Sequence, residues 1–141
     1  MATKVQVTFD CEDDPHRMAR FWAEALGYEK ESHVELVTQL LDAGRIPESA
    51  TVTVDGGTQF ADVSACRDPE GAGPRLFFQK VPEGKTVKNR VHLDLQVGAD
   101  RYEEEAERLE SLGARKLWFS DDRGGPCWTM ADVEGNEFCV D

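Results

Sequence analysis

The stretch VQVTFDCEDDPHRMARFWAEALG, residues 5–27, decides the fold because a strand pattern and a helix pattern follow each other directly in it. Apolar and polar residues alternate from Val5 to Cys11, which predicts a half-buried strand. Asp14-Pro15 supplies an N-cap and a first-turn proline, and apolar residues then recur at helical spacing until Gly27. We therefore expect a strand that leads at once into an amphipathic helix.

The same pattern returns in VHLDLQVGADRYEEEAERLESLG, residues 91–113. His92 and Gln6 are 92 − 6 = 86 residues apart, and Gly113 and Gly27 are 113 − 27 = 86 residues apart. Further on, Asp68-Pro69-Glu70-Gly71 resembles Asp132-Val133-Glu134-Gly135 at an offset of 132 − 68 = 64. The chain is therefore predicted to be a duplication whose first copy carries 86 − 64 = 22 extra residues.

The insertion is predicted around residues 32–49, as an extra helix that a capping box of Ser32 and Glu35 begins and Gly44 ends. Residues 91–97 are expected to form the first strand of the second copy. The remaining strands, rich in β-branched and aromatic residues, are expected at 51–54, 60–66, 75–81, 115–119, 127–131 and 137–140. Arg123-Gly124-Gly125-Pro126 is expected to be a turn.

Each copy thus has the order β-α-β-β-β, and the fold class is α+β. We expect one domain over 1–141, with module one at 1–84 and module two at 88–141. A sheet with a helix on one face leaves its other face in need of cover. Two such modules forming a curved mixed sheet would shelter that face as the wall of a cup-shaped pocket.

Composition narrows the function classes. The formal charge of −12 repels phosphate backbones and anionic membranes, so nucleic acid and membrane are not expected partners. No apolar run approaches the length of a membrane span or a signal peptide, and we expect a cytoplasmic protein. The spacing of Cys11, Cys66, Cys127 and Cys139 matches neither a redox pair nor a zinc knuckle, so free and mostly buried thiols are expected.

The sequence resembles the vicinal oxygen chelate superfamily, which contains glyoxalases, bleomycin-resistance proteins and dioxygenases. Within this superfamily it resembles the glyoxalase-like domain group. The resemblance covers essentially the whole chain. It rests on Phe9-Asp10-Cys11 ahead of Asp14-Pro15, on FWA and ALG within residues 21–27, on GPRLFFQKVPEGKTVKNRVHLDL at 73–95, and on EGNEFCV at 134–140.

The resemblance implies a site for one divalent metal ion, held by four inward side chains from the first and last strands of the two repeats. Carried over position by position, these are Gln6, Gln79, His92 and Cys139. Of these only His92 is a good ligand for Zn²⁺, Ni²⁺, Mn²⁺ or Fe²⁺, and Cys139 stands where a carboxylate is usual. A complete metal site is therefore not expected, although a divalent metal stays an alternative; Glu137, on the same strand face as Cys139, offers another oxygen.

Without a metal, His92 and Asp94 are the candidate catalytic residues, because the carboxylate on the same strand face would orient the imidazole as a general base. The alternative is that His92 only lines the pocket. Aromatic walls with a few polar groups are typical of small-molecule pockets. Ligand-binding residues are therefore expected at Gln6, Thr8, Asp10, Gln79, Gln96, Trp118, Trp128 and Cys139.

Two functions remain open. The first is a small-molecule-binding protein, similar to the bleomycin-sequestering relatives, whose acidic cup captures a cationic or aromatic compound. The second is a metal-dependent or His-based lyase, isomerase or dioxygenase that acts on a small oxygenated metabolite. The resemblance also implies a homodimer, with the cup in one chain or across two.

Overall fold

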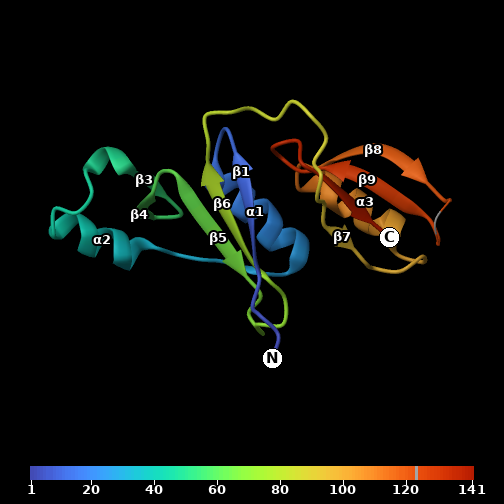
Figure 1. Cartoon of the computed structure of the whole chain (residues 1–141), viewed down its shortest axis with the longest axis horizontal. Helices are drawn as coiled ribbons and strands as arrows, with labels where there is room; N and C mark the ends of the chain where they lie inside the picture. The colour runs from blue at the N-terminus through green and yellow to red at the C-terminus, as the bar shows by residue number, and fades with distance from the viewer. Residues whose placement is uncertain (123) are drawn as a thin grey trace. The chain divides into compact units, whose positions relative to one another are not determined.

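The structure, a computed structural model, describes residues 1–122 and 124–141. The described chain divides into two compact units, Met1–Glu83 (unit 1) and Gly84–Asp141 (unit 2). Both mix helices and strands, which confirms the α+β class (Figure 1). None of the helices in the described part of the chain has the length and apolar character of a membrane span. Arg123, at the start of a predicted turn, lies outside the described residues.

Unit 1 contains a four-stranded sheet in the order β1-β6-β5-β2, with β1 parallel to β6 and the other neighbours antiparallel. Helix α1 packs against β5 and β6 (Figure 1). The bounds are β1 Gln6–Cys11, α1 Pro15–Leu26, β2 Glu29–Lys30, β5 Val63–Arg67 and β6 Arg75–Lys80.

Helix α1 begins and ends where the sequence indicates. The Asp14 side chain accepts a hydrogen bond from the His16 N–H at 2.9 Å, and Gly27 closes the helix in the left-handed conformation with φ 68°. The buried face of α1 carries Trp22, whose ring lies 5.4 Å from that of Phe9 on β1. The core of unit 1 therefore lies between α1 and one face of the sheet.

The insertion between β2 and β5 holds helix α2 (Val34–Asp42), a 3₁₀ turn (Glu48–Ala50), and strands β3 (Thr51–Val54) and β4 (Gly57–Phe60). The predicted extra helix is present, but His33 is its N-cap and no side chain caps it, so the predicted capping box is wrong. The strand predicted at 60–66 is divided, because β4 ends at Phe60 and β5 begins at Val63. Strand β3 pairs only with β4, as a separate hairpin, and the two residues of β2 occupy the sheet edge instead.

Unit 2 repeats this topology, since its sheet has the order β7-β10-β9-β8 with β7 parallel to β10. Helix α3 covers one face of this sheet (Figure 1). The bounds are β7 Asp94–Leu95, α3 Tyr102–Ser111, β8 Arg115–Ser120, β9 Cys127–Ala131 and β10 Glu137–Val140. The strand predicted at 91–97 is therefore much shorter, and Val91, which lies outside it, is 80% exposed.

Both units close their last two strands with an acidic turn. The Asp68 carboxylate accepts three backbone hydrogen bonds at 2.8–3.0 Å, and the Asp132 carboxylate accepts two at 2.9 and 3.0 Å. Asp132 is only 4% exposed and also accepts from the Asn136 side-chain amide. These turns set the register in which β6 and β10 return along their sheets.

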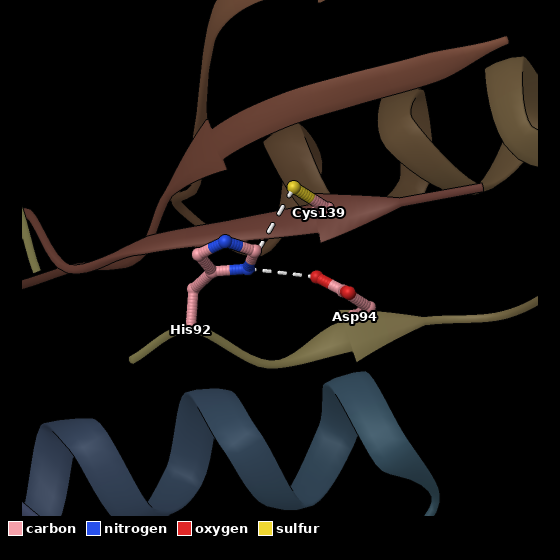
Figure 2. A group of neighbouring side chains, drawn as sticks. All are labelled: His92, Asp94 and Cys139. Atoms are coloured by element: carbon pink, nitrogen blue, oxygen red, sulfur yellow. Dashed lines mark hydrogen bonds and ion pairs between the residues drawn. The ribbon is translucent and has the colours of Figure 1, made fainter. Parts of the chain in front are cut away.

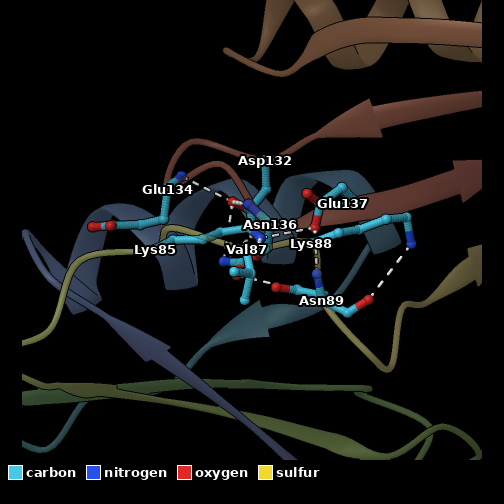
Figure 3. A network of polar contacts seen from close by, with 8 residues as sticks. All are labelled: Lys85, Val87, Lys88, Asn89, Asp132, Glu134, Asn136 and Glu137. Atoms are coloured by element: carbon cyan, nitrogen blue, oxygen red, sulfur yellow. Dashed lines mark hydrogen bonds and ion pairs between the residues drawn. The ribbon is translucent and has the colours of Figure 1, made fainter.

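The segment that leads into β7 is held by Glu137 at the start of β10 (Figure 3). The Glu137 carboxylate accepts a hydrogen bond from the Asn89 N–H at 2.9 Å and forms an ion pair with Lys85 Nζ at 3.0 Å. The Asn89 side-chain amide donates to Asn136 Oδ1 at 3.2 Å. Burial by itself raises the pKa of Glu137, but these hydrogen bonds bring it below its ordinary value. The chain is thereby fixed three residues ahead of His92.

Candidate functional site

His92, Asp94 and Cys139 meet on one face of the unit 2 sheet (Figure 2). The parallel register places Cys139 of β10 beside Asp94 of β7, and His92 precedes Asp94 by two residues. His92 Nδ1 lies 2.8 Å from Asp94 Oδ1 and 4.0 Å from Cys139 Sγ. Because a carboxylate only accepts, the imidazole Nδ1–H donates to Asp94, and this leaves Nε2 as the unprotonated nitrogen of the neutral ring.

These side chains reach solvent. His92 is 37% exposed and Asp94 is 48% exposed, so a dissolved ligand can contact both. Cys139 is half-buried, and its sulfur lies 3.6 Å from Thr129 Oγ1. The site therefore combines an imidazole, a carboxylate and a thiol at the surface of a rigid sheet.

The cluster forms part of a hollow of about 880 Å³ within unit 2. Its described lining contains the carboxylates of Asp94, Asp122 and Asp141 and no Lys or Arg side chain. The lining residues come from β7 and the loop after it, from the segment between β8 and β9, and from β10: His92, Asp94, Gln96, Val97, Gly98, Ala99, Ser120, Asp122, Gly124, Gly125, Pro126, Cys127, Cys139 and Asp141.

One candidate ligand atom each from His92, Asp94 and Cys139 lies within 4.8 Å of the others, which is compact enough for a metal ion after small side-chain rotations. The donor set contains one nitrogen, one oxygen and one sulfur. Such a set fits a borderline ion of the zinc type better than a hard ion, which prefers oxygen alone. The residues present therefore fit a divalent metal, with Asp94 in a role that sequence reasoning did not assign to it.

Cys127 also lines this hollow, and sequence reasoning missed it. Burial first, and the neighbouring Cys139 second, raise the pKa of Cys127 to about 11. Cys11 and Cys66 are buried, as predicted, and burial raises the pKa of Cys66 to about 12. Cys127 could have been predicted as a lining residue from its place on β9, the strand that pairs with the strand of Cys139.

The predicted site residues of module one lie together on the exposed face of β1 and β6 in unit 1. Gln6 is opposite Arg75, and Asp10 is opposite Gln79, whose amide donates to the Asp10 carboxylate at 2.9 Å. Thr8 is exposed between them on the same face. Whether Gln6 and Gln79 share one interior with His92 and Cys139 stays a prediction.

Gln6 is engaged in an ion-pair network. Its Oε1 accepts a hydrogen bond from Arg75 at 2.7 Å, and Arg75 also donates two hydrogen bonds to Glu31 at 2.8 and 2.7 Å. The hydrogen bond from Arg75 is the largest influence on Glu31 and lowers its pKa. The Gln6 side-chain oxygen is therefore part of this hydrogen-bonded network in unit 1.

The two predicted tryptophans are not among the residues that line the hollow. Trp128 lies on the helix side of the sheet, where its Nε1–H donates to Glu103 of α3 at 2.7 Å and Lys116 Nζ lies 4.8 Å from its ring centre. Trp118 is 47% exposed on the edge strand β8. Of the predicted ligand-binding set, the hollow of unit 2 brings together Gln96 and Cys139 with the pair His92 and Asp94.

Solved structures share this fold over nearly the whole chain. The hypothetical protein SA1046 from S. aureus is 13% identical, with a TM-score of 0.62 and coverage of 99% of this chain and 93% of its own. A point mutant of the fosfomycin resistance protein FosX from Listeria monocytogenes, complexed with Mn(II) and 1S,2S-dihydroxypropylphosphonic acid, is 12% identical, with a TM-score of 0.60 and coverage of 99% and 90%.

A glyoxalase/bleomycin resistance protein/dioxygenase family enzyme from Burkholderia phytofirmans is 12% identical, with a TM-score of 0.61 and coverage of 96% of this chain and 94% of its own. At such identities the likeness concerns the fold alone. No curated protein matches the sequence significantly. The model of the glyoxalase-like domain matches residues 6–140, and the chain therefore belongs to the glyoxalase-like domain family.

Proposed function

We propose that this protein binds a small organic cation in the hollow of unit 2. The observation that supports the proposal is the charge of the lining, in which three carboxylates, Asp94, Asp122 and Asp141, have no Lys or Arg beside them among the described lining residues. Carboxylates that line a concave surface concentrate the local field and attract positive ligands. The formal charge of −12 adds to this attraction at long range.

The dimensions of the hollow agree with an organic ligand. Its volume of about 880 Å³ lies within the usual range for small-molecule pockets. Val97, Ala99 and Pro126 supply apolar surface, and Gln96 and Ser120 supply neutral polar groups. A compound with one cationic group and an apolar body fits this combination.

Calorimetric titration with small organic compounds tests the proposal. It compares quaternary ammonium and guanidinium compounds with carboxylates of similar size. Cationic compounds should bind, and their affinity should fall as salt screens the carboxylates. Asp122→Asn should weaken binding about five- to tenfold, which corresponds to about 1 kcal/mol.

Asp42→Asn is the matched control, because it removes the same charge from an exposed position at the end of α2 in unit 1. It should leave the affinity unchanged. Equal binding of anionic compounds, or full binding by the Asp94→Asn/Asp122→Asn double variant, would contradict the proposal.

An enzymatic role is the second candidate, and the 2.8 Å hydrogen bond between His92 and Asp94 favours it. Asp94 holds the imidazole in one orientation, and Nε2 is then able to accept a proton from a bound oxygenated metabolite. A divalent metal held by His92, Asp94 and Cys139 would supply Lewis-acid activation of a bound oxygen. Either chemistry belongs to a lyase, isomerase or dioxygenase.

Solvent deuterium exchange into small hydroxy and keto compounds, followed by NMR, tests this candidate, with and without added zinc. His92→Gln should abolish exchange. Asp94→Asn should reduce it about 10- to 100-fold, which is part of the roughly 10²- to 10⁴-fold that a positioned base contributes. Exchange that persists in His92→Gln, or its absence from the parent protein in both conditions, would exclude proton abstraction by His92.

We also propose that the protein is a cytoplasmic homodimer. Resemblance to the superfamily supports self-association, and the formal charge of −12 together with the absence of a membrane-spanning helix from the described residues agrees with an aqueous compartment. Light scattering of the purified chain should give twice the mass of 15.8 kDa. A mass equal to one chain at micromolar concentration would contradict the dimer.

A further inference from the structure

We propose that the β8 edge of the unit 2 sheet pairs with the β8 edge of a second copy of this chain, antiparallel about a two-fold axis at Phe119. The inference rests on the homodimer proposed above and names the surface through which the two chains associate. It does not depend on the ligand of the hollow, because the paired residues lie along the sheet edge.

The outer strands of the two sheets are built differently (Figure 1). In unit 1 the outer strand β2 has only two residues, Glu29 and Lys30, and both are charged. In unit 2 the outer strand β8 has six residues, Arg115–Ser120, and within the described part of the chain it pairs only with β9. Short or charged outer strands resist pairing with another chain, whereas a long apolar one presents unpaired backbone groups to it. The β8 edge therefore has the features of a pairing surface.

An exposed aromatic ring lies on each face of this edge. Trp118 is 47% exposed and is opposite Thr129, so it lies on the hollow side of the sheet. Phe119 is 46% exposed on the helix side, where its ring centre lies 5.4 Å from that of Trp128 and 6.1 Å from that of Tyr102. Aromatic side chains are enriched in protein interfaces and often carry much of their binding energy. A second strand along β8 covers both exposed rings.

A bulge in β8 determines which part of the strand can pair. The register with β9 shifts between Lys116 and Trp118, so the first half of β8 is irregular. Bulges disturb the ladder and discourage pairing at a sheet edge. The regular part, Trp118–Ser120, has Phe119 at its centre. An antiparallel pair about Phe119 places its ring beside its own copy and Trp118 beside Ser120 of the second copy, so each side chain meets one from the same face.

The charges at the two ends of β8 favour a second copy over an unrelated strand. Arg115 at its start is exposed, and so are Asp121 and Asp122 directly after its end. Antiparallel pairing about Phe119 brings the basic start of one strand beside the acidic end of the other, twice in the dimer. Because the bulge adds one residue, Arg115 lies level with Asp122 of the second copy. A two-fold interface requires a self-complementary surface of this kind.

Analytical ultracentrifugation of the full-length protein over a range of concentrations tests the proposal. Phe119→Lys should raise the dimer dissociation constant at least about 30-fold, the loss typical of a central interface residue, because two cations then face each other at the axis. Val52→Lys is the matched control, since it introduces the same charge at a 39% exposed apolar position on β3 in unit 1. It should leave the dissociation constant unchanged.

A charge exchange tests the register and decides the question if Phe119→Lys does not fold. Arg115→Asp should weaken the dimer about five- to tenfold, because two carboxylates then face each other at each end of the paired strands. The double variant Arg115→Asp/Asp122→Arg should restore the affinity of the parent protein, because opposite charges meet again.

The results separate the β8 pairing from the homodimer on which it rests. A parent protein that sediments as a single chain at micromolar concentration would overturn both. A dimer of undiminished affinity in folded Phe119→Lys would overturn the β8 pairing alone, and so would charge variants that show no loss in the single variant or no recovery in the double variant.

Discussion

The two units have the same strand order but use corresponding positions differently. Gln6 and His92 stand 86 residues apart at equivalent places in the duplication. In unit 1 the last strand begins with the cation Arg75, which donates hydrogen bonds to Glu31 and to Gln6 itself. In unit 2 the last strand begins with the anion Glu137, which accepts a hydrogen bond from Asn89 and forms an ion pair with Lys85 in the segment ahead of β7.

This difference explains why a site is found in one unit. Lys85 and the Asn89 backbone neutralise and hydrogen-bond Glu137, so His92 is left to pair with Asp94 and to face the hollow. In unit 1, by contrast, Gln6 itself accepts a hydrogen bond from Arg75. Of these two equivalent positions, the one that faces the hollow is therefore the one whose neighbour, Glu137, is held by a separate segment.

The largest effect is expected at the two acidic turns. Asp132→Ala should reduce the free energy of unfolding by about 2–3 kcal/mol, because it leaves one buried and one partly buried backbone N–H group of the turn unsatisfied. Asp68→Ala should cost less, since that turn is near the surface. Urea unfolding of both variants measures the difference, and equal losses would show that burial does not distinguish the turns.

The ion-pair network of unit 1 is expected to give the next largest effect. Glu31→Gln should destabilise the protein by about 1–2 kcal/mol, because Arg75 loses a charged partner. His92→Gln, which places the residue of unit 1 in unit 2, should change stability by less than about 0.5 kcal/mol, since His92 is substantially exposed. A destabilisation by His92→Gln as large as that by Glu31→Gln would mean that His92 is structural.

A smaller, pH-dependent effect is expected from His16 in α1, which is 3% exposed and whose Nε2 lies 2.7 Å from the Phe60 carbonyl oxygen. Burial lowers its pKa below the ordinary value of 6.5, so the unfolded chain binds a proton more readily than the folded one. Its contribution to stability is therefore complete above pH 6.5 and is lost as the pH falls below that value.

Thermal unfolding between pH 7.5 and pH 5 measures this loss. Glu31 stays ionised over this range because its pKa lies below the ordinary value of 4.5, so it does not add to the pH dependence. His16→Gln should lower stability at pH 7.5 but flatten its dependence on pH. A variant that keeps the full pH dependence of the parent would show that another group causes it.

The smallest effect is expected from Trp128. Trp128→Phe should change the free energy of unfolding by less than about 0.5 kcal/mol, since it removes one exposed hydrogen bond to Glu103. It should also leave organic-cation binding unchanged, because Trp128 lies on the helix side of the sheet. Affinity that falls in Trp128→Phe, measured by calorimetry, would place this ring in the ligand site after all.

The local parts of the fold were predictable from the sequence. Asp14-Pro15 and Gly27 bound α1 as expected, because capping depends on a few neighbouring residues. The error at 60–66 has a physical reason, since Thr51–Val54 and Gly57–Phe60 form a hairpin of their own, and strand patterns do not tell which strand a segment pairs with. The two-residue β2 was too short to show a period.

The candidate site was predictable only in part. His92 and Asp94 share a face by the period of a strand, and they are indeed hydrogen-bonded. The place of Cys127 beside Cys139 depends on the register of β9 and β10, which the turn at Asp132 sets and which composition does not reveal. The side of the sheet that Trp128 occupies depends on the same register.

Strand β7 has only two residues in the ladder, Asp94 and Leu95, so the backbone that carries His92 lies at an edge with few amide hydrogen bonds. Amides around His92 should therefore exchange with solvent much faster than those of β9, which has a neighbour on each side. A ligand that contacts His92 would slow this exchange. Amide exchange at the short edge strand β7 can therefore be used to detect ligand binding at the imidazole.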